Sequence, residues 1–247
     1  MTLQHAFHIS SLEFLPDGYL VSSDGNGEIM LWDTVTGSCA RTVKAHSWVT
    51  RLSVSQSKSK LASTSWKTVS LWDTMSWECM SMFECDDLVL SVALYPSGIQ
   101  VAACTEETLY VWHTGDQQLT VSKNISECKC VAVSHDGKWL AVASSKTILY
   151  DAGTLDCIWS HDNVCNSVSF SPDSHQLVCG HSGGVQLLNA QTGSRVNSFQ
   201  HENVQRAVFF HDCTRVISGE SCSAAVSLVS YIYQLPLMAL VDFGTCT

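Results

Sequence analysis

Basic residues are scarce in this chain of 247 residues. The sequence has 13 lysines and arginines against 23 aspartates and glutamates, a formal net charge of −10. Binding to the phosphates of a nucleic acid requires the opposite balance, so we expect no nucleic-acid partner. The charge suits a basic segment of a protein partner, or simple solubility. Apolar residues make up 45% and charged residues only 15%, which excludes an intrinsically disordered chain and allows a sizeable core.

Paired cysteines at a metal-binding spacing and a secretory start are also lacking. The 12 cysteines are scattered without a CxxC pair, which argues against a zinc site. The segment Met1–His8 does not show the basic-then-apolar pattern of a signal peptide. We therefore expect reduced and mostly buried thiols in a cytoplasmic or nuclear protein, with no metal and no cofactor.

One uncharged stretch is long enough to raise the question of a membrane helix. Residues 221–241 carry no charge over 21 residues, which is close to the length of a spanning helix. The stretch contains four serines, Gln234 and Pro236, and no lysine or arginine follows Arg215. We expect no membrane segment, because the repeat described next accounts for the first half of the stretch as a strand.

Three similar strings of residues recur at a spacing of 40 residues. They read Leu31-Trp32-Asp33, Leu71-Trp72-Asp73 and Val111-Trp112, and weaker echoes follow at 149–151, 187–189 and 228–230. A turn of the kind seen at 14–18 lies upstream of each string, and a further series of equivalent positions starts with His5 and His46. The strings, the turns and this series recur at the same spacing, which indicates an internal repeat of about 40 residues.

Each repeat is expected to contain four short strands. Residues alternate between apolar and polar with a period of two, as at 167–170, and no stretch shows a convincing helical period. Four-stranded units at this period predict an all-β fold, a β-propeller with six visible blades. The predicted repeats of this propeller (1–230) are approximately 5–43, 44–83, 84–122, 123–159, 160–199 and 200–230. The tail 231–247 is a candidate for the outer strand of blade 6.

The repeat resembles the WD-repeat β-propeller family over residues 5–230. The resemblance rests on the three strings above, on turns similar to Phe-x-Pro-Asp-Gly and on the upstream histidines. In that family a hydrogen-bonded set of His, Ser or Thr, Asp and Trp often braces a blade. Matched by position, blade 1 offers His5, Ser22, Asn26 and Trp32, and blade 2 offers His46, Ser63 and Trp72 without an aspartate. The repeat residues are then His5, Ser22, Trp32, Asp33, His46, Ser63, Trp72, Asp73 and Trp112.

The resemblance also raises expectations about completeness and function. Family members commonly have seven blades closed by an N-terminal strand, so six repeats predict an incomplete or open propeller. Blades 4 to 6 lack the Trp, and no blade offers the full bracing set. The family implies a non-catalytic scaffold or adaptor. The alternative is a truncated copy of a larger protein, such as a ubiquitin-ligase substrate receptor or a nucleotide-binding switch protein, without its effector domain.

The candidate catalytic motifs fall at positions that do not suit catalysis. Ser55 and Lys58 have a Ser-x-x-Lys spacing but fall in a turn between strands. The segment 24–28 looks like a broken calcium loop, although its register makes it a turn. Cys128 and Cys130 share one face of a strand, where a buried pair is the simpler interpretation. We expect that the protein is not an enzyme.

The resemblance implies that partners dock at the end of the propeller that carries the histidine connectors and the turns before the Trp strands. Two tryptophans of blade 2 and a series of carboxylates fall in these loops. The predicted partner-binding residues are Trp48, Trp66, Asp86, Asp87, Glu106, Glu107, Glu127, Asp162 and Glu202. Such a surface would attract a segment rich in lysine or arginine, with the indoles as apolar anchors. Alternatively, these carboxylates are merely solvated.

Overall fold

A computed structural model describes residues 5–15, 18–45, 48–57, 59–210, 213–220 and 231–234. These residues contain strands and turns and no helix, which confirms the predicted all-β class. None of them forms a helix with the length and apolarity that a membrane crossing requires. The chain divides into an N-terminal unit, Met1–Ile125, and a C-terminal unit, Ser126–Thr247, which are described separately.

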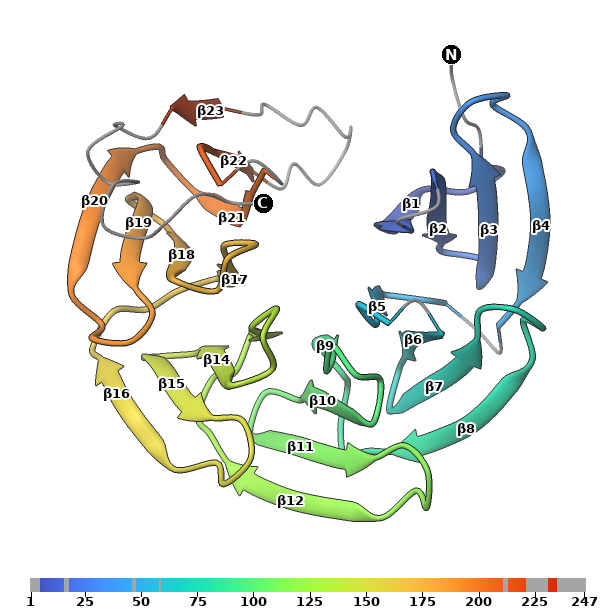
Figure 1. Ribbon diagram of the computed structural model, residues 1–247, viewed down its shortest axis with the longest axis horizontal. Helices are drawn as coiled ribbons and strands as arrows, with labels where there is room; N and C mark the ends of the chain where they lie inside the picture. Colours follow the sequence, from blue (N-terminus) through green and yellow to red (C-terminus); the bar gives the residue numbers. More distant parts are fainter. Residues whose placement is uncertain are drawn as a thin grey trace. The chain divides into compact units, whose positions relative to one another are not determined.

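The N-terminal unit consists of three antiparallel four-stranded sheets, the blades, and each blade uses its strands in sequence order. Blade 1 contains β1 (Ile9–Leu15), β2 (Tyr19–Asp24), β3 (Glu28–Asp33) and β4 (Cys39–Lys44). Blade 2 contains β5 (Arg51–Val54), β6 (Lys60–Ser65), β7 (Thr68–Asp73) and β8 (Cys79–Glu84). Blade 3 contains β9 (Ser91–Leu94), β10 (Gln100–Cys104), β11 (Thr108–His113) and β12 (Leu119–Asn124). The first strands β1, β5 and β9 lie side by side (Figure 1).

The C-terminal unit repeats this arrangement. Blade 4 contains β13 (Cys130–Val133), β14 (Trp139–Ala143), β15 (Thr147–Asp151) and β16 (Cys157–His161). Blade 5 contains β17 (Ser167–Phe170), β18 (Gln176–His181), β19 (Gly184–Asn189) and β20 (Arg195–Gln200). The described part of blade 6 contains β21 (Val204–Phe209), β22 (Arg215–Glu220) and β23 (Tyr231–Gln234).

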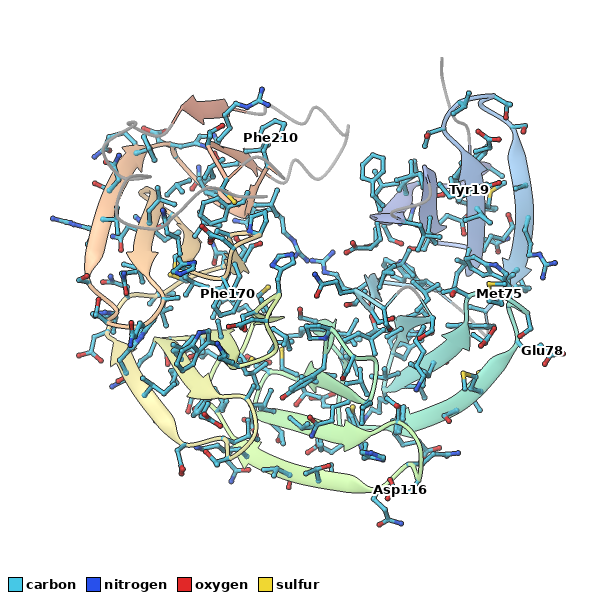
Figure 2. The ribbon with its side chains drawn as sticks, in the orientation of Figure 1. Tyr19, Met75, Glu78, Asp116, Phe170 and Phe210 are labelled. Carbon is cyan, nitrogen blue, oxygen red and sulfur yellow. The ribbon has the colours of Figure 1, made fainter. Side chains whose placement is uncertain are left out.

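Within each unit, neighbouring blades bury apolar side chains between their sheets. The strand β10 is almost entirely buried, whereas the outer strand β8 alternates between exposed and buried residues. Between blades 2 and 3 the core includes Leu71, Phe83 and Val101. In the C-terminal unit Phe170 is buried in the core that blades 4 and 5 share (Figure 2). A single sheet could not bury both faces, which is why the repeat must stack.

The repeated tryptophans tie the third strand of a blade to its second strand. Trp32 Nε1 donates to Ser22 Oγ at 2.7 Å, and Trp72 Nε1 donates to Ser63 Oγ at 2.9 Å, as the family pattern implies. Trp112 is also buried, and its ring stacks on Tyr110 with centroids 5.1 Å apart. These bonds satisfy the indole N–H groups, which would be costly to bury alone.

The bracing set of blade 1 is complete, contrary to our expectation that Asn26 takes the carboxylate position. His5 Nδ1 lies 3.2 Å from Asp24 Oδ2, and His5 Nε2 contacts Ser22 Oγ. Burial pushes the pKa of Asp24 up, but the N–H of Glu28, the His5 ring and the N–H of Asn26 outweigh this effect and lower that pKa. The carboxylate comes from the last residue of β2 because from there it reaches both the turn and the imidazole. His46 lies outside the described residues.

The aspartate that follows the repeated tryptophan closes the turn between the third and fourth strands. Asp33 Oδ1 accepts N–H bonds from Val35 and Thr36 at 2.8 and 3.0 Å. Asp73 Oδ1 accepts the same bonds from Met75 and Ser76, and Met75 lies exposed at this turn (Figure 2). An Asx side chain can mimic a backbone turn in this way.

These turn carboxylates predict a dependence of stability on pH. The N–H groups of Ser76 and Met75 lower the pKa of Asp73 from its ordinary value of 3.8. The stabilisation is therefore complete above the unfolded-state pKa and is lost as pH falls through the lower folded-state pKa. Asn189 makes the corresponding turn bond to Thr192 with an amide oxygen, at 2.9 Å.

The substitution Asp73→Asn tests this prediction. The amide keeps an acceptor in the turn but cannot titrate, so the variant should lose less free energy of unfolding than the wild type between pH 5 and pH 2. Urea unfolding at several pH values measures the difference. Equal losses in the two proteins would show that this carboxylate does not contribute to the acid sensitivity.

The last described strand and one cysteine near the end of the chain differ from the sequence predictions. The strand β23 pairs directly with β22, and Tyr233 lies opposite Val216. The repeat spacing had predicted that the third strand of blade 6 contains residues 228–230. Residues 221–230 and 235–247 lie outside the described residues, so the outer-strand and membrane predictions for them stay predictions. Cys213 is disulfide-bonded, so the expectation of reduced thiols throughout is wrong at this position.

Candidate functional site

In the N-terminal unit the connector that leaves each blade is bonded to the turn between the second and third strands of that same blade. Ala45 N–H donates to Gly27 O at 2.8 Å, Cys85 N–H to Lys67 O at 2.8 Å, and Ile125 N–H to Glu107 O at 2.7 Å. The same bond therefore recurs in all three blades. It brings to one end of this unit the two sets of loops on which the predicted partner-binding residues lie.

A pocket of about 330 Å³ opens among the connectors of blades 1, 2 and 3. Its lining residues are His8, Ser10, Trp48, Thr50, Arg51, Leu88, Val89 and Leu90. Trp48 is 47% exposed and Leu88 is 41% exposed, whereas Val89 is buried. The pocket therefore combines an apolar wall with hydroxyl and guanidinium groups, the usual mixture in a binding site.

Trp48 forms one wall of the pocket and has an aromatic neighbour. Its ring meets His8 edge to face, with centroids 5.8 Å apart and an interplanar angle of 89°. His8 is itself set by the turn of blade 1, since Gly25 N–H donates to His8 O at 3.1 Å. The indole is exposed, as predicted, and lines the pocket; its role as a partner anchor stays a prediction.

Trp66 occupies a different place from Trp48. It lies with Lys67 in the two-residue turn between β6 and β7, adopts a positive φ of 49° and is 60% exposed. Its carbonyl accepts the N–H of Val89 at 2.7 Å, which holds the turn against the connector of blade 3. The short turn points the indole outward, as expected, but Trp66 is not among the residues that line the pocket.

The predicted carboxylates of blade 3 do not line the pocket. Asp86 and Asp87 immediately precede Leu88, and Glu106 and Glu107 lie in the turn between β10 and β11; all four are exposed. The Asp86 N–H donates to the Tyr110 hydroxyl at 3.4 Å, which helps to fix the connector. The connector and the turn of blade 3 thus carry four exposed carboxylates.

Lys67 is the cation closest to these carboxylates among the interactions described. Its Nζ donates to Asp86 O at 2.6 Å and lies 3.9 Å from Asp87 Oδ1. The two side chains are 58% and 69% exposed, so their attraction is weak and easily replaced. An incoming cation could therefore take the place of Lys67 beside Asp87.

The other predicted carboxylates belong to the C-terminal unit. Glu127, Asp162 and Glu202 are all exposed. Asp162 already pairs with Lys146 at 2.7 Å, and this hydrogen bond lowers the pKa of Asp162. Its charge is thus partly compensated within its own unit.

Several residues of the pocket were not predicted from the sequence. Arg51, Thr50 and Leu90 line the pocket but are not among the predicted partner-binding residues. The 40-residue spacing of the repeats could have located these pocket residues. His8, Trp48 and Leu88 occupy equivalent places in three repeats, and Ser10, Thr50 and Leu90 follow two residues later.

Groups with catalytic or metal-binding potential are sparse in the described part of the chain. No cluster of three or more His, Cys, Asp or Glu residues there could hold a metal ion. Hydrogen bonding to the Cys179 thiol lowers the pKa of Cys165, and Thr147 Oγ1 donates to Cys165 Sγ at 3.0 Å. Both thiols are buried in the core between blades 4 and 5, where a substrate cannot reach them. Cys128 and Cys130 are likewise buried.

Repeated antiparallel sheets with a Trp–Ser bond and an Asp-closed turn define a repeat protein built of β-propeller blades. A family model for the WD domain, G-beta repeat (WD40), matches residues 1–33, 37–73, 117–150 and 153–189, which is more than half of the chain. The chain belongs to this family. WD40 repeats generally mediate protein–protein interactions, and their domains are typically non-catalytic. No curated protein sequence matches the chain.

Proposed function

We propose that this protein is a non-catalytic scaffold or adaptor that docks a protein partner at the connector end of its N-terminal unit. The observation that carries the proposal is the pocket walled by the exposed side chains of Trp48 and Leu88. Tryptophan in a pocket is a frequent anchor of protein interfaces. An enzymatic role has no comparable support from the described residues.

The partner segment has a bulky apolar residue flanked by lysine or arginine. The apolar residue fills the pocket beside Trp48, while the flanking cations lie near Asp86, Asp87, Glu106 and Glu107. Exposed charges of this kind mainly accelerate association and set specificity, whereas the buried anchor controls dissociation. Because screening acts over about 10 Å at 0.1 M salt, binding weakens as salt rises.

A peptide titration tests this proposal on the full chain. The probe is a fluorescein-labelled peptide with a central phenylalanine and two lysines on each side, and the control peptide carries serines in place of the lysines. Fluorescence anisotropy should show tighter binding of the lysine-flanked peptide, with an advantage that decreases at high salt. Reversing Asp86, Asp87, Glu106 and Glu107 to lysine should abolish the advantage.

A matched double reversal controls for net charge. Glu78 and Asp156 are exposed in turns between the third and fourth strands of blades 2 and 4, so replacing both by lysine changes the net charge as much as reversing Asp86 and Asp87 does, but should leave binding nearly unchanged. The proposed docking end is misplaced if the two sets of reversals have equal effects, or if the serine-flanked peptide binds as well as the lysine-flanked one.

The substitution Lys67→Met is expected to improve binding of the basic peptide. Lys67 competes with the peptide for Asp87 and reduces the negative field around Asp86. Removing one exposed charge should raise the association rate constant roughly two- to fivefold, the range of a surface ion pair. Stopped-flow fluorescence measures the rate, and Lys146→Met in the C-terminal unit serves as control. A rate no higher than that of the wild type would exclude this competition.

A further inference from the structure

We infer that the outer strand of blade 2 is a second docking surface, which pairs with an extended, basic segment of another protein. The strand β8 lies at the edge of its sheet, beyond β7, and is the outermost strand of the blade (Figure 1). An edge strand directs every second N–H and C=O away from its own sheet, where a further strand can bind them. No residue of β8 lines the pocket, so this surface goes beyond the proposed function.

Two exposed methionines distinguish β8 from the other outer strands. Met80 is 48% exposed and Met82 is 51% exposed. Met82 lies opposite Ser70 of β7. The residues at the equivalent position of the other described outer strands are Thr42, Ser122, Ser160 and Ser198. Blade 2 therefore exposes an adaptable apolar side chain where four other blades carry a hydroxyl, and methionine is frequent at surfaces that bind other proteins.

Two carboxylates bracket these methionines. Glu78 precedes β8, next to the turn that carries Met75 (Figure 2), and Glu84 ends the strand; both are exposed. Within the described residues neither carboxylate takes part in an ion pair. The neighbouring outer strand β4 differs, because it carries Arg41 and Lys44, and cations on an edge discourage pairing with other chains. The charge of β8 is thus complementary to lysine or arginine at both ends of a partner segment.

The partner segment has an alternating sequence. Side chains two residues apart share one face of a strand, so the pattern basic-x-apolar-x-apolar-x-basic presents two apolar groups and two cations on the same face. The sheet register shifts at Met80, so we expect regular pairing along 81–84, with Met80 and Glu78 in contact with the end of the segment. A second copy of β8 does not fit, because in either direction it would bring carboxylates against carboxylates.

The experiment uses the full chain and a fluorescein-labelled probe peptide, Lys-Thr-Leu-Thr-Phe-Thr-Lys. The control peptide, Lys-Thr-Thr-Leu-Phe-Thr-Lys, has the same composition without the alternation, and fluorescence anisotropy should show about fivefold weaker binding for it. Met82→Thr, which introduces the residue found at this position in blade 1, should weaken the probe by about three- to fivefold, the effect of one cross-strand pair. Met75→Thr is the matched control without effect, since Met75 is 87% exposed and lies outside the strand.

Two further measurements test the charges and the backbone pairing separately. Replacing both Glu78 and Glu84 by lysine should weaken the probe about fivefold and strengthen, by a similar factor, a peptide that carries glutamate at both ends. Two probe peptides that are N-methylated at neighbouring central residues test the pairing. Only every second N–H faces β8, so one of these peptides should lose binding and the other should keep it.

The outcomes separate this inference from the proposed function. Equal affinity for the probe and the control peptide, or equal effects of the two N-methylations, would overturn strand pairing at β8. If Trp48→Ala weakens the probe as much as Met82→Thr does, the probe occupies the pocket, which overturns the inference and leaves the proposed function in place. A dimer in sedimentation that Met82→Thr dissociates would also overturn it, because a second copy would then cover β8. Thermal unfolding of each variant confirms that the blades remain folded.

Discussion

Trp48→Ala should weaken binding of the lysine-flanked phenylalanine peptide by roughly tenfold or more, which corresponds to about 1–2 kcal/mol. The indole is 47% exposed and forms a wall of the pocket, so its removal takes away the apolar surface on which the anchor packs. The loss should appear mainly as faster dissociation, because the charges that steer association are untouched.

Trp66→Ala is the comparison for this variant. Trp66 is more exposed than Trp48 and does not line the pocket, so its removal should change dissociation less. Surface plasmon resonance with the immobilised peptide measures both rate constants. If Trp66→Ala has the larger effect, the anchor sits against the turn between β6 and β7 and not in the pocket.

Gly184→Ala should lower the free energy of unfolding of the C-terminal unit by roughly 2–4 kcal/mol. Gly184 opens β19 with a φ of +146°, a region that residues with a Cβ rarely adopt. A Cβ there would lie 2.1 Å from Phe199 O on the neighbouring strand β20. Neither backbone can move away without losing the pairing between Gly184 and Gln200.

The control for Gly184 is Gly153→Ala in the turn after β15. A Cβ on Gly153 would meet Asp151 Oδ1 at 3.4 Å, an ordinary contact, and the residue is exposed. Its effect should stay within about 0.5 kcal/mol. Urea unfolding followed by circular dichroism measures both variants. Comparable stabilities for Gly184→Ala and the wild type would mean that the strands β19 and β20 pair differently.

The blades could be predicted from the sequence because they depend on local patterns that recur. Trp32 with Ser22 and Trp72 with Ser63 each pair across adjacent strands, so a fixed spacing within one repeat was enough to match them. The carboxylate of blade 1 was assigned to Asn26 instead of Asp24, because spacing alone does not show which side chain in a tight turn reaches the histidine.

The pocket depends on contacts that no single repeat contains. The exposure of Trp48 was predicted from its loop position, but the pocket around it was not, because Arg51 opens β5 in blade 2 and Leu90 immediately precedes β9 in blade 3. Their approach is a consequence of how the first strands β1, β5 and β9 stack. Reading equivalent positions across the three repeats, rather than along one, would have placed His8, Trp48 and Leu88 together.

The most direct test of the docking site is the indole spectrum of the full chain with and without the lysine-flanked phenylalanine peptide. Trp48 carries an exposed indole at the pocket, whereas the indoles of Trp32 and Trp72 are buried and bonded to serines. In ¹⁵N-labelled protein, with signals assigned by Trp→Phe variants, the peptide should shift the Trp48 indole resonance in a saturable way and leave those of Trp32 and Trp72 in place. A peptide that binds while the Trp48 resonance stays unmoved would contradict docking at this pocket.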